Sequence, residues 1–92
     1  MSASGTAADI TVYRTGWCPY CERARQILLK KGLKFAEIDV EEDSAKRAEM
    51  IARSGRRTVP QIFIGERHIG GCDELSALAD SGELDRIIQG AK

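Results

Sequence analysis

Apolar and polar positions alternate over two short segments, residues 10–13 and residues 35–40. Alternation with a period of two is typical of half-buried strands. Between these segments, apolar residues recur at helical spacing from Ala24 to Leu28, and Gly32 is placed to end the helix. Strand, helix and strand in this order predict a right-handed βαβ unit with parallel strands.

A second helix is expected after residue 42, with Asp43 or Ser44 as its cap. Its apolar positions predict that Ala48, Ile51 and Ala52 are buried.

A hairpin and two helices are expected in the last third of the chain. Residues 61–64 and 67–69 flank Gly65 and Glu66, which predicts two antiparallel strands. Two further segments of helical spacing follow, separated at Gly82. The chain as a whole therefore predicts an α/β domain with a four-stranded mixed sheet and helices on both faces.

Composition and charge fit one small domain and exclude several classes of protein. The 92 residues are 42% hydrophobic, and Lys plus Arg balance Asp plus Glu at 14 each. We therefore expect no binding to nucleic acid or to a membrane surface, and no segment approaches membrane-spanning length. Residues 1–8 carry no targeting signal and are expected to form a disordered tail before the domain, residues 9–92.

Two cysteines, Cys18 and Cys21, lie where the first strand gives way to the first helix. If Pro19 is the first helical residue, the unpaired amides of the first turn point at the Cys18 sulfur and favour its thiolate. Cys18 is therefore the expected nucleophile. Cys21 lies one turn further and shares a helix face with Ala24, so we expect it to be buried, less reactive and within disulfide reach.

The cysteine pair has two other interpretations, a zinc site and a structural disulfide. A tetrahedral zinc site needs four ligands, and only Cys72 and His68 remain, without the usual paired spacing. A disulfide between Cys18 and Cys21 closes a very short loop and constrains the unfolded chain little. Three cysteines with one tight pair also fit a reducing compartment better than a secreted disulfide framework.

Two later motifs accompany the dithiol. Pro60 begins an apolar strand, which is an ordinary place for proline, although a cis bond between Val59 and Pro60 is the sharper interpretation. Gly70 and Gly71 precede a helix, which fits either an ordinary turn or a ligand that approaches backbone amides. Asp73 is placed to cap that helix.

The three motifs Cys-Pro-Tyr-Cys (18–21), Thr-Val-Pro (58–60) and Gly-Gly-Cys-Asp (70–73) together resemble those of the glutaredoxins. These proteins are the glutathione-dependent branch of the thioredoxin fold, so the resemblance implies that fold. It also implies a glutathione-dependent enzyme that reduces protein–glutathione mixed disulfides and protein disulfides.

The resemblance further implies a binding site for glutathione. It places the cysteinyl portion of the ligand against the backbone of Val59, and the γ-glutamyl end against the amides of Cys72 and Asp73 and the Asp73 carboxylate. The expected glutathione-binding residues are Tyr20, Arg57, Thr58, Val59, Pro60, Gly71, Cys72 and Asp73.

One position departs from the family pattern. Thr15 stands where many members carry a lysine. We expect Arg57 to pair with the glycyl carboxylate instead, with Arg56 as the next candidate. The neighbouring Arg14 is expected to point away from the site by strand alternation.

The same resemblance implies glutathione as the only cosubstrate, with no metal or flavin. It also implies a cytoplasmic monomer that acts on glutathionylated or disulfide-containing proteins such as ribonucleotide reductase. Two other functions stay open. One is a thioredoxin-like electron carrier recharged by a flavoprotein reductase, and the other is a module in which two chains hold an iron–sulfur cluster through Cys18 and glutathione.

Overall fold

The computed structural model describes residues 9–90. Strands and helices alternate along the first part of the chain, and a hairpin and two helices follow. In chain order the elements are β1 (Ile10–Arg14), α1 (Pro19–Lys30), β2 (Ala36–Asp39), α2 (Ser44–Ser54), β3 (Gln61–Ile64), β4 (Arg67–Gly70), α3 (Cys72–Ser81) and α4 (Glu83–Gly90). The expected disordered tail, residues 1–8, lies outside the described residues, as do residues 91–92.

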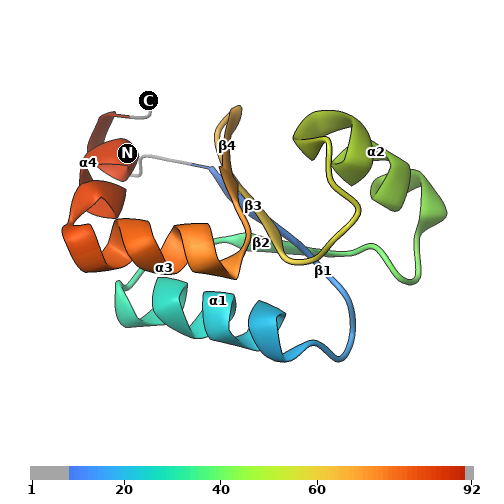
Figure 1. The fold of residues 1–92 in the computed structure, drawn as a ribbon, viewed down its shortest axis with the longest axis horizontal. Coiled ribbons are helices and arrows are strands. Elements are labelled where there is room, and N and C mark those ends of the chain that lie inside the picture. Colours follow the sequence, from blue (N-terminus) through green and yellow to red (C-terminus); the bar gives the residue numbers. More distant parts are fainter. Residues whose placement is uncertain (1–8, 91–92) are drawn as a thin grey trace.

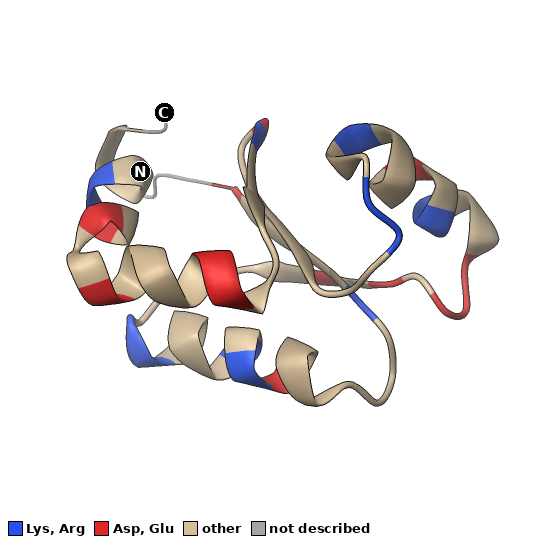
Figure 2. Cartoon of the chain, viewed as in Figure 1, with Lys and Arg blue, Asp and Glu red and all other residues tan. Residues whose placement is uncertain are grey.

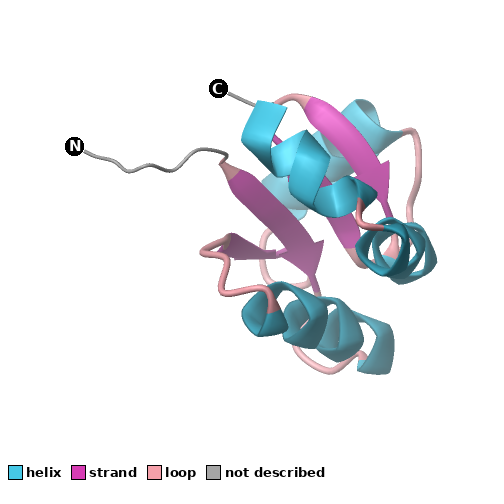
Figure 3. Cartoon of the chain, turned by 90° about the vertical axis from the view of Figure 1, so that its left-hand side faces the viewer, coloured by secondary structure: helices cyan, strands magenta, loops and turns pink. Residues whose placement is uncertain are grey.

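The sheet has the strand order β2-β1-β3-β4. β1 pairs in parallel with β2 and antiparallel with β3, and β3 forms an antiparallel hairpin with β4. Helices α1 and α3 lie side by side on one face of the sheet, and α2 covers the other (Figure 1). A view turned by 90° shows helices on both sides of the strands (Figure 3). The predicted mixed sheet and parallel βαβ unit are therefore confirmed.

Two apolar clusters fill the two sides of the sheet. The cluster beneath α1, α3 and α4, which we call the α1/α3 core, consists of Ile10, Val12, Ala24, Leu28, Ile62, Ile64, Ile69, Cys72, Leu75 and Leu84. The cluster beneath α2, which we call the α2 core, consists of Tyr13, Val40, Met50 and Phe63. Among residues 9–90, no helix combines the length and the apolar character needed to cross a membrane.

The predicted buried face of α2 was wrong. Ala48 and Ala52 are exposed and Ile51 is only partly buried, whereas Met50 is completely buried. The helix is rotated so that its longest apolar side chain reaches the cluster that contains Phe63. A methionine fills such a gap between helix and sheet, which the short side chain of alanine does not.

The beginnings of α2 and α3 use different caps. Asp43 Oδ1 accepts a backbone N–H of the first turn of α2 at 3.1 Å, so the first of the two predicted caps is correct. The prediction that Asp73 caps α3 was wrong, because Gly71 is the capping residue and Asp73 already lies within the helix. Glu74 instead reaches back and accepts the Gly71 N–H at 2.7 Å.

Candidate active site

Cys18 lies at the start of α1, where the sequence predicts it. Its backbone is extended and Pro19 is the first helical residue. Its Sγ accepts the backbone N–H of Cys21 at 3.3 Å. The first turn of a helix presents its unpaired amides and the positive end of its dipole to this sulfur, so the position suits a thiolate.

Cys21 faces the interior of the protein. It is 2% exposed and shares the buried face of α1 with Ala24 and Leu28, as predicted. Burial raises the pKa of the Cys21 thiol well above its usual range, and the hydrogen bond with Cys18 adds to this rise. Cys21 therefore keeps its proton at neutral pH, whereas the partly exposed Cys18 is open to attack a disulfide.

Two aromatic side chains flank Cys18 at the surface. Trp17 is 85% exposed and Tyr20 is 56% exposed. An exposure this high leaves the Trp17 ring free to contact a substrate.

A pocket opens where the start of α1, the segment before β3 and the start of α3 meet. It is lined by Tyr20, Arg56, Thr58, Val59, Pro60, Gly71, Cys72, Asp73 and Glu74. The structure thus brings together every expected glutathione-binding residue except Arg57, which is exposed and does not line the pocket. Cys72 is buried, and burial raises its pKa. The bond between Val59 and Pro60 is cis, as predicted.

Two glycines allow the turn into α3 to approach the proline segment. Gly70 has φ +120°, and a Cβ there would lie 2.8 Å from Glu74 Oε1, too close for a real contact. A Cβ on Gly71 would lie 3.4 Å from the carbonyl oxygen of Pro60. The absence of side chains at both positions therefore keeps this wall of the pocket narrow and its backbone accessible.

The pocket contains charges of both signs. Glu74 Oε1 lies 3.6 Å from Arg56 Nη1. The hydrogen bond from the Gly71 amide lowers the pKa of the Glu74 carboxyl and keeps it ionised. The acidic start of α3 faces the basic segment that precedes β3 (Figure 2). The pocket therefore suits a ligand that itself carries both ammonium and carboxylate groups.

Sequence reasoning missed the role of Gln61. This side chain is completely buried, and its Nε2 donates to the Thr58 carbonyl at 3.0 Å and to the Thr58 hydroxyl at 3.1 Å. Its Oε1 lies 2.7 Å from His68 Nε2, which links β4 to the pocket segment. His68 is half-buried, and burial lowers its pKa. The signal in the sequence is a glutamine directly after Pro60, at the beginning of the apolar segment that forms β3.

Sequence reasoning also underrated Arg56 and missed Glu74. Nothing in the spacing of Arg56 and Arg57 tells which of the two adjacent arginines faces a pocket.

Among the described residues, no group of three or more His, Cys, Asp or Glu side chains is arranged to hold a metal ion.

Comparison with known proteins agrees with this geometry. The glutaredoxin family model matches residues 10–69. Glutaredoxin 3 of Escherichia coli (strain K12) is 51% identical over 82 residues, which are 89% of this chain and 99% of that protein. Neither of the two alternative functions is favoured by these matches.

Solved structures extend the same result to the fold. The solution structure of glutaredoxin from Brucella melitensis has a TM-score of 0.81 and 49% identity, with 95% of each chain covered. The crystal structure of the buckwheat glutaredoxin–glutathione complex has a TM-score of 0.80 and 30% identity, with 88% of this chain and 76% of that chain covered. The chain therefore belongs to the glutaredoxin family and is a glutathione-dependent thiol–disulfide oxidoreductase with the thioredoxin fold.

Proposed function

We propose that Cys18 is the nucleophile and Cys21 the resolving thiol of this oxidoreductase. The observation that carries the assignment is the contrast between the two thiols. Cys18 is partly exposed at a helix start with a backbone amide on its sulfur, whereas Cys21 is buried and has a raised pKa. The nucleophile of thiol–disulfide exchange is the thiolate, and it must reach its substrate.

With a protein–glutathione mixed disulfide, Cys18 alone is sufficient. Its thiolate attacks the glutathione sulfur, the protein thiolate leaves and takes up a proton, and glutathione stays bound to Cys18 by a disulfide. A second glutathione thiolate then attacks the glutathione sulfur of this adduct. Oxidised glutathione departs and the Cys18 thiolate is restored.

With a protein disulfide, both cysteines take part. Cys18 attacks one sulfur and forms a mixed disulfide with the substrate, and the other substrate sulfur leaves as a thiol. Cys21 then loses its proton and attacks Cys18 Sγ, which releases the second substrate thiolate and forms the Cys18–Cys21 bridge. Two molecules of glutathione reduce this bridge.

We propose that glutathione occupies the pocket beside Tyr20. The Val59 backbone would pair with the cysteinyl portion, the α3 amides would bind the γ-glutamyl carboxylate, and the Asp73 carboxylate would take the ammonium group. Arg56, which lines the pocket, supplies the cation for a glutathione carboxylate in place of Arg57. The site therefore comprises Tyr20, Arg56, Thr58, Val59, Pro60, Gly71, Cys72 and Asp73.

We further propose a monomer that works in the cytoplasm without metal or flavin, with its functional domain spanning residues 9–92. Disulfide-containing proteins such as ribonucleotide reductase are its proposed substrates. A chain with three cysteines and one tight pair suits a reducing compartment, which supports this location.

Two cysteine variants test the division of labour. Cys18→Ser should lower both activities by roughly a thousandfold or more, because the nucleophile is lost. Cys21→Ser should retain deglutathionylation of a small mixed disulfide and lose most reduction of a protein disulfide. Coupled assays of oxidised-glutathione formation measure both. Equal loss of deglutathionylation in the two variants would contradict the assignment.

A further inference from the structure

Residues 15–17, which we call the dithiol loop, connect β1 to the dithiol and are held by two charged side chains. Arg14 Nε donates to the Thr15 carbonyl at 3.2 Å, and its Nη2 donates to the Gly16 carbonyl at 3.4 Å. From the other side, Glu41 Oε1 accepts the Gly16 N–H at 3.3 Å. The conformation of this loop is therefore fixed by side chains of β1 and of the segment after β2 as well as by its own sequence.

Arg14 is itself anchored. Its Nη1 lies 2.6 Å from Glu37 Oε1 on β2, and the two side chains are only 26% and 29% exposed. The second oxygen of Glu37 accepts from Arg25 Nε on α1 at 3.3 Å. A partly desolvated pair with a second cation behind it holds the Arg14 guanidinium in one place, unlike most pairs in open solvent.

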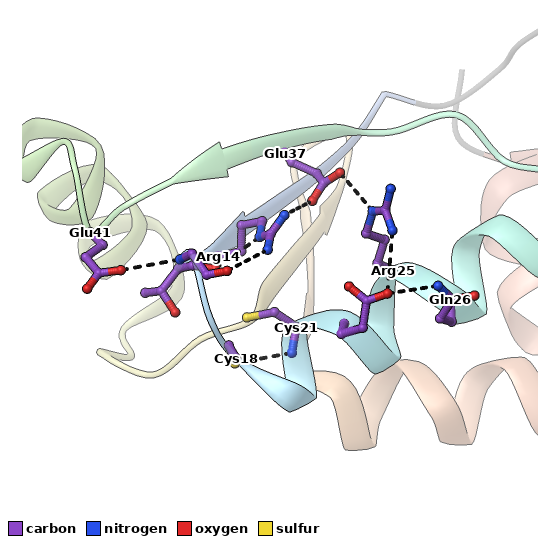
Figure 4. A network of polar contacts seen from close by, with 10 residues as sticks. Arg14, Cys18, Cys21, Arg25, Gln26, Glu37 and Glu41 are labelled. Atoms are coloured by element: carbon purple, nitrogen blue, oxygen red, sulfur yellow. Dashed lines mark hydrogen bonds and ion pairs between the residues drawn. The ribbon is translucent and has the colours of Figure 1, made fainter.

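Cys21 faces the same loop. Figure 4 shows its side chain directed from α1 toward the dithiol loop, beside Arg14. The Thr15 backbone and the positive charge of Arg14 both lower the Cys21 pKa, against the larger rise from burial and from Cys18. Arg14 on β1 and Cys18, which caps α1, are thus the charged and titratable groups that act on this thiol.

We propose that Arg14 is a positioning residue for the resolving step: it holds the Thr15 backbone against Cys21 and places a fixed positive charge beside that thiol. The proposal rests on the roles assigned to Cys18 and Cys21 above. Strand alternation predicts that Arg14 points away from the site, and Arg14 does not line the pocket beside Tyr20. Its contacts lead instead to the second cysteine.

The step concerned is the attack of Cys21 on a mixed disulfide. Cys21 loses its proton to water, its thiolate attacks Cys18 Sγ, the Cys18–Cys21 bond forms, and the substrate sulfur leaves as a thiolate. A nearby guanidinium favours the Cys21 thiolate before attack. The first step uses only Cys18 and gains nothing from this charge at Cys21.

Stopped-flow absorbance with an equimolar aromatic disulfide, which releases a coloured aryl thiolate, separates the two steps. The first release reports attack by Cys18, and the second reports resolution by Cys21 and is absent in Cys21→Ser. Arg14→Met should slow the second release about three- to tenfold at neutral pH. The pH at which the rate of this release rises should also be higher in the variant. The first release should stay within about twofold of the original rate.

Arg25→Met is the matched control, because it removes the other cation on Glu37 without touching the dithiol loop. It should leave the first release unchanged and should slow the second release less than Arg14→Met does. Arg14→Lys keeps the charge and should bring the pH dependence of the second release most of the way back to that of the original protein. Arg14→Gln, which is also neutral, replaces Arg14→Met if the latter does not fold.

Three results would overturn the proposal: an unchanged second release in Arg14→Met, an equal slowing of both releases, or an equal effect of Arg25→Met. Failure of the original protein to show the first release would instead contradict the role of Cys18. The two failures are thus distinguishable.

Discussion

The two faces of the sheet are built in different ways. Beneath α1 and α3, the core consists of apolar side chains and a buried thiol, and the polar groups of the active site lie at helix starts and in the segment before β3. Beneath α2, the completely buried Tyr13 carries a hydroxyl that donates to Glu49 and accepts from Arg53 Nη1 at 2.8 Å. The reactive thiols are thus supported by an apolar core, whereas hydrogen bonds and ion pairs between side chains stabilise the opposite face.

Arg53 ties the α2 face together. Its guanidinium lies 4.1 Å from the centre of the Phe63 ring, and Phe63 meets Tyr13 edge to face at 5.7 Å between ring centres. The α2 core contains far fewer apolar residues than the α1/α3 core, so its polar contacts matter more. We therefore expect the α1/α3 face to respond most to changes in volume, and the α2 face to changes in polarity and pH.

The largest effect is expected from truncation within the α1/α3 core. Leu28 is completely buried on α1, about two turns after Cys21, so Leu28→Ala should lower the free energy of unfolding by about 2 to 5 kcal/mol. Leu29→Ala is the matched control, because Leu29 is 46% exposed, and this substitution should lower the free energy of unfolding by about 0.5 kcal/mol or less. Urea unfolding measures both. Similar losses in the two variants would show that α1 does not lie on an apolar core.

On the α2 face, removal of a single oxygen should have a smaller but measurable cost. Tyr13→Phe keeps the ring and leaves Glu49 and Arg53 without their shared partner, so the free energy of unfolding should fall by about 1 to 2 kcal/mol. Tyr20→Phe, which alters an exposed tyrosine, should not change stability. An unchanged free energy of unfolding in Tyr13→Phe would mean that apolar packing alone holds α2 on the sheet.

The same variant should change the response to acid. The hydrogen bond from Tyr13 lowers the pKa of the Glu49 carboxyl, so the folded state favours the carboxylate. This contribution is present above the unfolded pKa of about 4.3 and is lost as pH falls through the lower, folded value. Unfolding curves should be measured between neutral and acid pH. The difference in the free energy of unfolding between the original protein and Tyr13→Phe should become smaller below about pH 4. A constant difference would rule out this linkage.

The sequence predicted the α1/α3 face more completely than the α2 face. Helix starts, glycines and the Cys-Pro-Tyr-Cys spacing are local signals, so Cys18 and Cys21 could be placed without any knowledge of packing. The same signals predicted a turn after Gly70, although they named the wrong cap for α3. The orientation of α2 depends on which side chain reaches the sheet, and the pattern of Ala48, Ile51 and Ala52 did not reveal that Met50 does so.

Side-chain partners across the fold could not be predicted for a related reason. The contact between Gln61 and His68, like the one between Arg14 and Glu37, could be predicted only if the register of the separate strands were known. A short-range pattern carries no information about that register. The same holds for Arg56 and Arg57, whose directions depend on how the segment after α2 turns toward α3.

The smallest expected effect concerns the place where the two faces meet. Arg56 follows α2, and its partner Glu74 belongs to α3, so this pair spans the pocket between the two regions. Arg56→Ala should raise the KM for glutathione by about three- to tenfold, since its side chain is 46% exposed and water weakens the charged hydrogen bond. The increase should be larger at low salt than at high salt, because exposed charges are screened. Arg57→Ala is the matched control: it removes an adjacent, exposed arginine outside the pocket and should leave the KM unchanged. A larger effect of Arg57→Ala would return the carboxylate site to Arg57 and would mean that the α2 side reaches the ligand through the residue that directly precedes Thr58.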